Sequence, residues 1–180
     1  MKHSPVRLIC LVLVLLLLVA SVVPASAAKK KKKKQKPPSG AYVVEITNPR
    51  DRLNVHGIPD INDISDHLED GTVVMYMESE DGWWYVEWWK GQDLYGEGYV
   101  AKDFLSKIDK DPDWVFKNVV GLYVHSQPRV PEGECEKYHI GLLKKGTKLK
   151  ILEQDGTWCK IAYEDGFGWI PSRYLVRVKK

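Results

Sequence analysis

The strongest constraint on this chain is an internal repeat, because the same short motifs occur twice in the same order. The first copy begins at Leu53-Asn54-Val55-His56 and the second at Leu122-Tyr123-Val124-His125. Each is followed by a glycine–threonine pair, a tryptophan with a nearby aliphatic residue, a glycine–aromatic–aliphatic triplet and an aromatic–leucine pair. Self-similarity of this kind indicates one small structural unit used twice.

The repeated motifs have the character of short β-strands. The later ones are Gly71-Thr72, Trp83 with Val86, Gly98-Tyr99-Val100 and Phe104-Leu105 in the first copy, and Gly146-Thr147, Trp158 with Ile161, Gly168-Trp169-Ile170 and Tyr174-Leu175 in the second. Polar and apolar residues alternate over 147–152, which is the pattern of a half-buried strand. Asp81-Gly82 and Asp155-Gly156 favour hairpin turns. Many short strands in about 60 residues predict a small all-β barrel.

The motifs resemble those of bacterial Src-homology-3 (SH3) domains, and the resemblance covers 41–108 and 118–178. It implies two SH3-like barrels in tandem, each with five or six strands. It also implies a binding role outside the membrane, often toward peptidoglycan or peptides and often as an accessory to cell-wall hydrolases. Both copies depart from the family pattern at His56 and His125, where the family usually has arginine.

The first forty residues predict export. Lys2 and Arg7 precede an apolar run, and Ala25-Ser26-Ala27 is a cleavage pattern, so we expect a signal peptide over 1–27. An uncleaved membrane anchor is the alternative. The predicted organisation then continues with a disordered Lys/Pro spacer (28–40), the first repeat (41–108), a linker (109–117) and the second repeat (118–178).

The spacer contains an unbroken lysine run, Lys29 to Lys34. Like charges in a block repel each other and remain solvated. The segment either makes weak electrostatic contact with anionic surfaces or serves as a solubilising linker.

Charge is distributed unequally between the repeats. Residues 41–108 hold 14 acids and 5 bases, a net charge of −9, whereas 118–180 hold 7 acids and 11 bases, a net charge of +4. Neither part shows the basic clustering that nucleic-acid binding requires, so no nucleic-acid partner is expected. Complementary charge steers protein partners, which keeps open a role as a protein–protein adaptor in the periplasm or on the cell surface.

Aromatic residues are the candidate ligand-binding groups. Trp83 and Trp84 are adjacent, as are Trp88 and Trp89, so one member of each pair should face the core and the other should be exposed. Exposed aromatic faces stack on sugars and peptide planes. The predicted binding residues are Trp83, Trp88, Trp89, Tyr95, Tyr99, Trp158 and Trp169. The alternative is that these side chains pack the two repeats together or cover loops.

The histidines and cysteines suggest three further hypotheses. His56 and His125 occupy equivalent positions and would make binding dependent on pH, or they are ordinary strand residues. Cys135 and Cys159 form a disulfide, or they are two separate thiols. A metal site of Cys135, His125 and His139 lacks an evident fourth ligand, so no metal is expected.

No catalytic constellation emerges from the sequence. The acids of 60–70 form a solvated loop, since no apolar surroundings raise the pKa of a candidate pair. We therefore expect a non-enzymatic, cofactor-free exported binding module that recognises a cell-envelope ligand, with peptidoglycan or its peptides as the leading candidate. Its partner is then a cell-wall polymer or an envelope protein.

Overall fold

The computed structural model describes residues 39–178 apart from 49, 91–92 and 132, and it leaves out the side chains of 90 and 93–95. The predicted signal peptide (1–27) and most of the predicted spacer (28–38) lie outside this range. Gly40, the last residue of the predicted spacer, already belongs to the first strand. Among the helices of the described part, none has the length and apolar character needed to cross a membrane.

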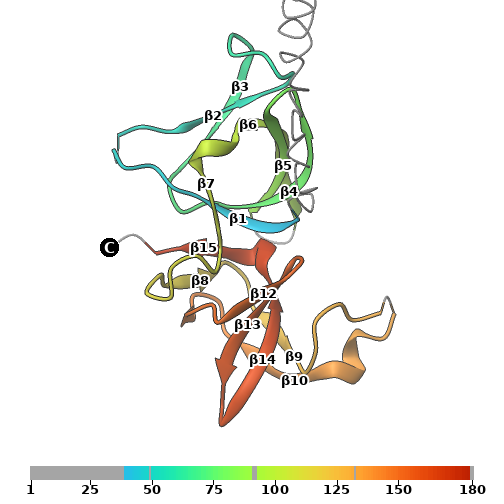
Figure 1. Cartoon of the computed structure of the whole chain (residues 1–180). Coiled ribbons are helices and arrows are strands. Elements are labelled where there is room, and N and C mark those ends of the chain that lie inside the picture. The colour runs from blue at the N-terminus through green and yellow to red at the C-terminus, as the bar shows by residue number, and fades with distance from the viewer. Residues whose placement is uncertain (1–38, 49, 91–92, 132, 179–180) are drawn as a thin grey trace, which may run out of the picture. The chain divides into compact units, whose positions relative to one another are not determined.

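The first repeat forms one antiparallel sheet of seven strands, in the order β3-β2-β6-β5-β4-β1-β7. Its strands are β1 (Gly40–Val44), β2 (Leu53–His56), β3 (Ile64–Leu68), β4 (Val73–Glu80), β5 (Trp83–Lys90), β6 (Asp93–Ala101) and β7 (Leu105–Lys107). Figure 1 shows these strands curling around a common interior. A short 3-10 helix, η1 (Lys102–Phe104), joins β6 to β7.

The second repeat is divided between a five-stranded sheet, β10-β9-β14-β13-β12, and a three-stranded sheet, β11-β8-β15. Its strands are β8 (Phe116–Asn118), β9 (Leu122–His125), β10 (His139–Leu143), β11 (Lys148–Leu149), β12 (Glu153–Asp155), β13 (Trp158–Tyr163), β14 (Gly166–Pro171) and β15 (Leu175–Arg177). The 3-10 helices η2 (Cys135–Tyr138) and η3 (Ser172–Tyr174) connect them. The all-β prediction is confirmed, while the boundaries predicted for the domains stay a prediction.

The two repeats share strand register as well as sequence motifs. Val86 is paired with Gly98 in the first repeat, and Ile161 is paired with Gly168 in the second. His56 and His125 lie opposite Tyr99 and Trp169 in the same way. The repeat that the sequence displays is therefore also a repeat of backbone pairing, which makes positions of the two copies directly comparable.

Both repeats have glycine at the start of the glycine–aromatic–aliphatic triplet, because a larger residue would not fit there. A Cβ atom at Gly98 would lie 2.5 Å from Val55 Cγ1, and one at Gly168 would lie 2.1 Å from Val124 Cγ1. Real Cβ atoms do not approach other atoms so closely. Glycine at this position therefore lets β6 and β14 pass close to the neighbouring strands β2 and β9.

We expect Gly168→Ala to destabilise the protein by about 1–3 kcal/mol, because the added methyl group overpacks the contact with Val124. Gly166→Ala, two residues earlier in β14, is the matched control, since its Cβ would meet nothing within 4 Å. Urea unfolding of both variants measures the difference. Equal midpoints for the two variants would contradict the steric explanation.

One buried cluster is shared by the two repeats. Its members from the first repeat are Ala41, Val43, Val73, Met75 and Ile108, and those from the linker and second repeat are Trp114, Phe116, Leu122, Val124, Ile151, Cys159, Ile161, Ile170 and Leu175. A separate cluster lies inside the first repeat and includes Tyr42, Val44 and Val74. Alternate residues of β1 and β4 thus serve two cores, which explains why β1 is buried along its whole length.

The predicted disulfide between Cys135 and Cys159 is wrong, because both thiols are free. Cys159 lies on β13 with its side chain in the shared core, whereas Cys135 begins the exposed helix η2. Burial raises the pKa of the Cys159 thiol, so it stays protonated and unreactive. The alternative interpretation, one buried and one exposed thiol, describes the structure.

Candidate functional site

A row of aromatic side chains lies on the outer surface of the second repeat. Strand alternation directs Leu122 and Val124 of β9 into the core and leaves Tyr123 exposed. The Tyr123 ring stacks on His139 with a centroid distance of 4.0 Å and an interplanar angle of 2°. His139 meets His125 edge-on at 4.8 Å, and His125 meets Trp158 edge-on at 4.9 Å. We call Tyr123, His139, His125 and Trp158 the aromatic band.

Two open cavities flank this band and share Pro171 in their walls. The first, of about 260 Å³, is lined by Tyr123, His125 and Tyr174, among others. The second, of about 360 Å³, is lined by Trp158, Trp89 and Arg173, among others. Shallow hollows on both sides of a row of rings suit an extended ligand that lays successive groups against aromatic faces.

His125 is held in its neutral form. It is 6% exposed, and its Nδ1 atom has no hydrogen-bond partner. Burial lowers the pKa of His125, and the nearby His139 lowers it further. The imidazole therefore contributes to the band as a neutral ring at neutral pH and does not act as a cation.

We expect acid to destabilise the protein through His125. Because its pKa is lower in the folded chain than in the unfolded chain, the unfolded state takes up the proton first as pH falls through about 6.5. Stability contributed by the neutral ring is complete above that value and decreases below it. The pKa of Glu45 is lowered mainly by a hydrogen bond from Ser106, so protonation of this carboxylate reduces stability only at more acidic pH.

Urea unfolding at pH 7.5 and 5.5 measures this effect. The unfolding midpoint should decrease more between these two pH values in the wild type than in His125→Phe, which keeps an aromatic ring beside Trp158. An equal decrease in both proteins would contradict the assignment to His125.

The corresponding surface of the first repeat has a different composition. His56 again lies edge-on to a tryptophan, Trp83, at 4.6 Å. Asn54 occupies the place of Tyr123, so the stacked ring is missing. Tyr85 and Tyr99 instead form an edge-on pair at 4.9 Å, and the Tyr99 hydroxyl donates a 2.8 Å hydrogen bond to Glu80. That hydrogen bond is the main reason why the pKa of Tyr99 is raised to about 12.

The predicted binding residues do not converge on one groove. Trp83 and Tyr99 lie on the outer face of the first repeat, and Trp158 and Trp169 lie on that of the second. Trp88 is only 2% exposed and belongs to the core of the first repeat. The side chain of Tyr95 lies outside the described residues. Whether these residues bind a ligand stays a prediction.

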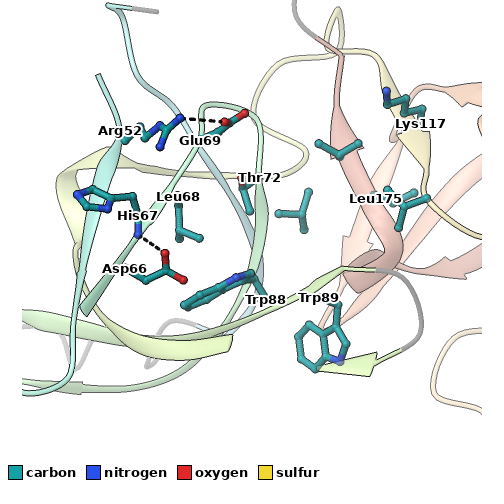
Figure 2. A pocket seen from close by; sticks show the side chains of 13 residues that line it. Arg52, Asp66, His67, Leu68, Glu69, Thr72, Trp88, Trp89, Lys117 and Leu175 are labelled. Atoms are coloured by element: carbon teal, nitrogen blue, oxygen red, sulfur yellow. Dashed lines mark hydrogen bonds and ion pairs between the residues drawn. The ribbon is translucent and has the colours of Figure 1, made fainter. Parts of the chain in front are cut away.

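Trp88 and Trp89 nevertheless both line a third cavity, of about 590 Å³ (Figure 2). Residues of both repeats contribute to it, with Leu68 and Thr72 from the first and Lys117 and Leu175 from the second. Arg52 and Glu69 lie at its edge and are 3.7 Å apart as an ion pair. The cavity combines an apolar floor with charged groups of both signs, so nothing in its walls selects a single class of ligand.

Sequence reasoning missed Tyr123 and Pro171 as members of the site, and it considered His139 only as a metal ligand. A signal for Tyr123 was present, because it stands two residues before His125 on the same strand and therefore shares its face. No comparable signal existed for His139, which reaches the band through the pairing of β10 with β9. Over the described ranges, no three His, Cys, Asp or Glu side chains gather as a metal site, and the expectation of no metal stays a prediction.

Part of the second repeat matches a known protein family. Residues 139–176 match the model of the bacterial SH3 domain, which confirms the SH3-like prediction for this part of the chain. The match does not extend to the first repeat, where the tandem arrangement rests on the shared register. A search of curated proteins gave no match.

Two solved structures from Trichomonas vaginalis show weak similarity. One is NlpC2, with 18% sequence identity and a TM-score of 0.35, covering 81% of this chain and 50% of that one. The other is NlpC1, with 15% identity and a TM-score of 0.34, covering 78% of this chain and 46% of that one. This chain thus spans half or less of the length of either structure.

Proposed function

We propose that this protein is an exported, non-catalytic binding module that recognises a cell-envelope polymer, namely peptidoglycan or its peptides, through the aromatic band. The observation that carries the proposal is the position of the band. Trp158 and His139 belong to the segment that matches the bacterial SH3 domain, and Tyr123 and His125 lie on the neighbouring strand β9. Bacterial SH3 domains commonly bind cell-wall components.

The chemistry of the band supports binding without bond cleavage. Aromatic rings provide large contact areas for sugar rings and peptide planes at a small loss of conformational entropy. Among the described residues, the ring contacts of the neutral His125 are His139 and Trp158, which provide contact area for a ligand.

Retention on purified, insoluble peptidoglycan tests the proposal. The mature chain should sediment with the polymer, and Tyr123→Ala and Trp158→Ala should each weaken retention about tenfold, as expected for an aromatic contact worth 1–2 kcal/mol. Phe104→Ala, at a ring of the first repeat that is 46% exposed, is the matched control and should bind as the wild type does. Folded protein that shows no retention, or equal retention by all variants, would overturn the proposal.

The unequal charge of the repeats favours one alternative, a protein–protein adaptor. A net charge of −9 over 41–108 would recruit a basic partner from the envelope. In the retention experiment, an added envelope protein that displaces the chain from peptidoglycan, with binding that weakens as salt rises, would favour the adaptor.

A further inference from the structure

The outer surface of the first repeat carries a cluster of tyrosines and carboxylates. Tyr85 on β5 is paired with Glu78 on β4 and with Tyr99 on β6, and Glu80 accepts the hydrogen bond from Tyr99. Burial and, after it, the nearby Glu97 carboxylate on β6 raise the pKa of Tyr85. We call Tyr85, Tyr99, Glu78, Glu80 and Glu97 the acidic tyrosine face.

The second repeat has a lysine at the position equivalent to Tyr85. The residue equivalent to Tyr85 is Lys160, since Lys160 is paired with Trp169 and Glu153 just as Tyr85 is paired with Tyr99 and Glu78. The Lys160 ammonium lies 5.0 Å from the Phe167 ring and 5.8 Å from the Trp169 ring. It also lies 3.3 Å from the Glu153 carboxylate. An ammonium group is therefore held there by aromatic rings and a carboxylate.

The first repeat keeps the surroundings of that ammonium but lacks the ammonium itself. Glu78 corresponds to Glu153 and Tyr99 corresponds to Trp169, while Glu97 replaces Phe167 and adds a second carboxylate. In the part of the chain that is described, none of Glu78, Glu80 and Glu97 forms an ion pair with a basic side chain. Unpaired carboxylates beside tyrosine rings attract a cation more strongly than either group alone.

His56 borders the same face. Its backbone is paired with Tyr99, its ring lies against Trp83, and it is only 3% exposed. His125 occupies the equivalent position in the second repeat, and the Nδ1 atoms of both histidines are buried without a hydrogen-bond partner. The two repeats therefore keep the same buried edge beside this face.

We propose that the acidic tyrosine face is a binding site for a primary ammonium group of the lysine type, presented by a peptide. This goes beyond the proposed function, because it concerns the other repeat and a different ligand chemistry. The occupant is a basic peptide, since the net charge of −9 over 41–108 repels anionic ligands and attracts cationic ones. The two repeats would then contact different groups, with the aromatic band stacking on planar groups and the acidic tyrosine face holding a cation.

Titration with a short lysine peptide tests the site directly. The probe is acetyl-Ala-Lys-Ala-amide, and the control ligand is the same peptide with its lysine Nε acetylated, which removes only the charge. NMR shifts of Tyr85 and Tyr99 in the mature chain report binding. We expect the charged peptide to bind at least tenfold more tightly than the acetylated one, with binding that weakens as salt rises. Equal binding of the two peptides, or no binding of either, would overturn the proposal.

Three variants locate the site. Glu78→Gln/Glu80→Gln should weaken binding at least tenfold, whereas Glu136→Gln/Glu164→Gln, which removes the same charge from exposed positions of the second repeat, should not. Tyr85→Lys places in the first repeat the ammonium that the second repeat already holds as Lys160, and it should abolish binding while the fold is kept. A Tyr85→Lys variant that still binds the charged peptide would contradict the proposal.

Failure of this proposal is distinguishable from failure of the proposed function. Tyr123→Ala should lose retention on peptidoglycan but bind the lysine peptide normally, because the two surfaces belong to different repeats. If Tyr123→Ala weakened binding of the lysine peptide instead, the ammonium site would lie on the aromatic band and not on the acidic tyrosine face.

Discussion

Replacing Phe116 by alanine is expected to lower the free energy of unfolding by about 3–5 kcal/mol, as is usual when a large buried ring is removed. Phe116 lies on β8 at the end of the predicted linker and is fully buried. It belongs to the cluster that joins Val43 and Met75 of the first repeat to Ile161 of the second. The cavity left by its ring would therefore open inside the core that both repeats share.

The shared core also predicts how the chain unfolds. Wild-type protein should show one urea transition when monitored by tryptophan fluorescence and by far-UV circular dichroism, because neither repeat can lose this core alone. Phe116→Ala should move the midpoint for both signals together. Phe104→Ala removes the same group from a ring that is 46% exposed and should change stability by no more than about 0.5 kcal/mol. Two separate transitions in the wild type would contradict a common core.

Replacing Arg177 by methionine is expected to destabilise the protein by about 3 kcal/mol, since it leaves the Asp70 carboxylate without its cation. Arg177 on β15 donates a 2.5 Å hydrogen bond to Asp70 of the first repeat, and the two side chains are 11% and 15% exposed. Asp70 also accepts the backbone N–H of Ile46 at 3.0 Å. Methionine keeps a long apolar stem, so the packing of Arg177 over the Trp114 ring at 4.7 Å is partly conserved.

A double-mutant cycle separates the pair from other effects of the substitutions. Asp70→Asn/Arg177→Met should be less destabilised than the sum of the single variants, because the amide leaves no uncompensated charge. Arg52→Met is the matched control. It breaks the ion pair with Glu69, whose side chains are 62% and 65% exposed, and should change stability by less than about 1 kcal/mol. Strict additivity at Asp70 and Arg177 would contradict a coupled pair.

Further backbone contacts join the repeats beside this ion pair. The Arg177 N–H donates to the Gly71 carbonyl at 2.9 Å, and Thr72 is paired with Val176 as an isolated bridge. The Gln154 side chain donates to the Ala41 carbonyl at 3.0 Å. These contacts, together with the shared core, hold the two repeats against each other on either side of the 109–117 connection.

The pairing of strands could be anticipated from the sequence because its causes are local. The Asp-Gly pairs favour tight turns. Asp81 and Gly82 have φ angles of 46° and 89°, the positive values that such hairpin turns require. Alternation along β9 places Val124 inside and Tyr123 outside without reference to any distant residue. At the bulge that interrupts the pairing of β5 with β6, Trp88 lies in the core of the first repeat and Trp89 is half-buried against the shared core, so the predicted exposed member of this pair is partly covered.

The sequence by itself indicated two copies of one small β-module, with the same strand motifs in the same order and aromatic residues on alternate faces of the strands. Only the tertiary structure decided which faces are covered. Val43 and Met75 could have faced solvent in an isolated module, yet they lie in the shared core, and Trp89 lines cavities formed by residues of both repeats. The physical reason is that turns and strand alternation depend on neighbouring residues, whereas burial depends on which distant surface supplies the opposing apolar area.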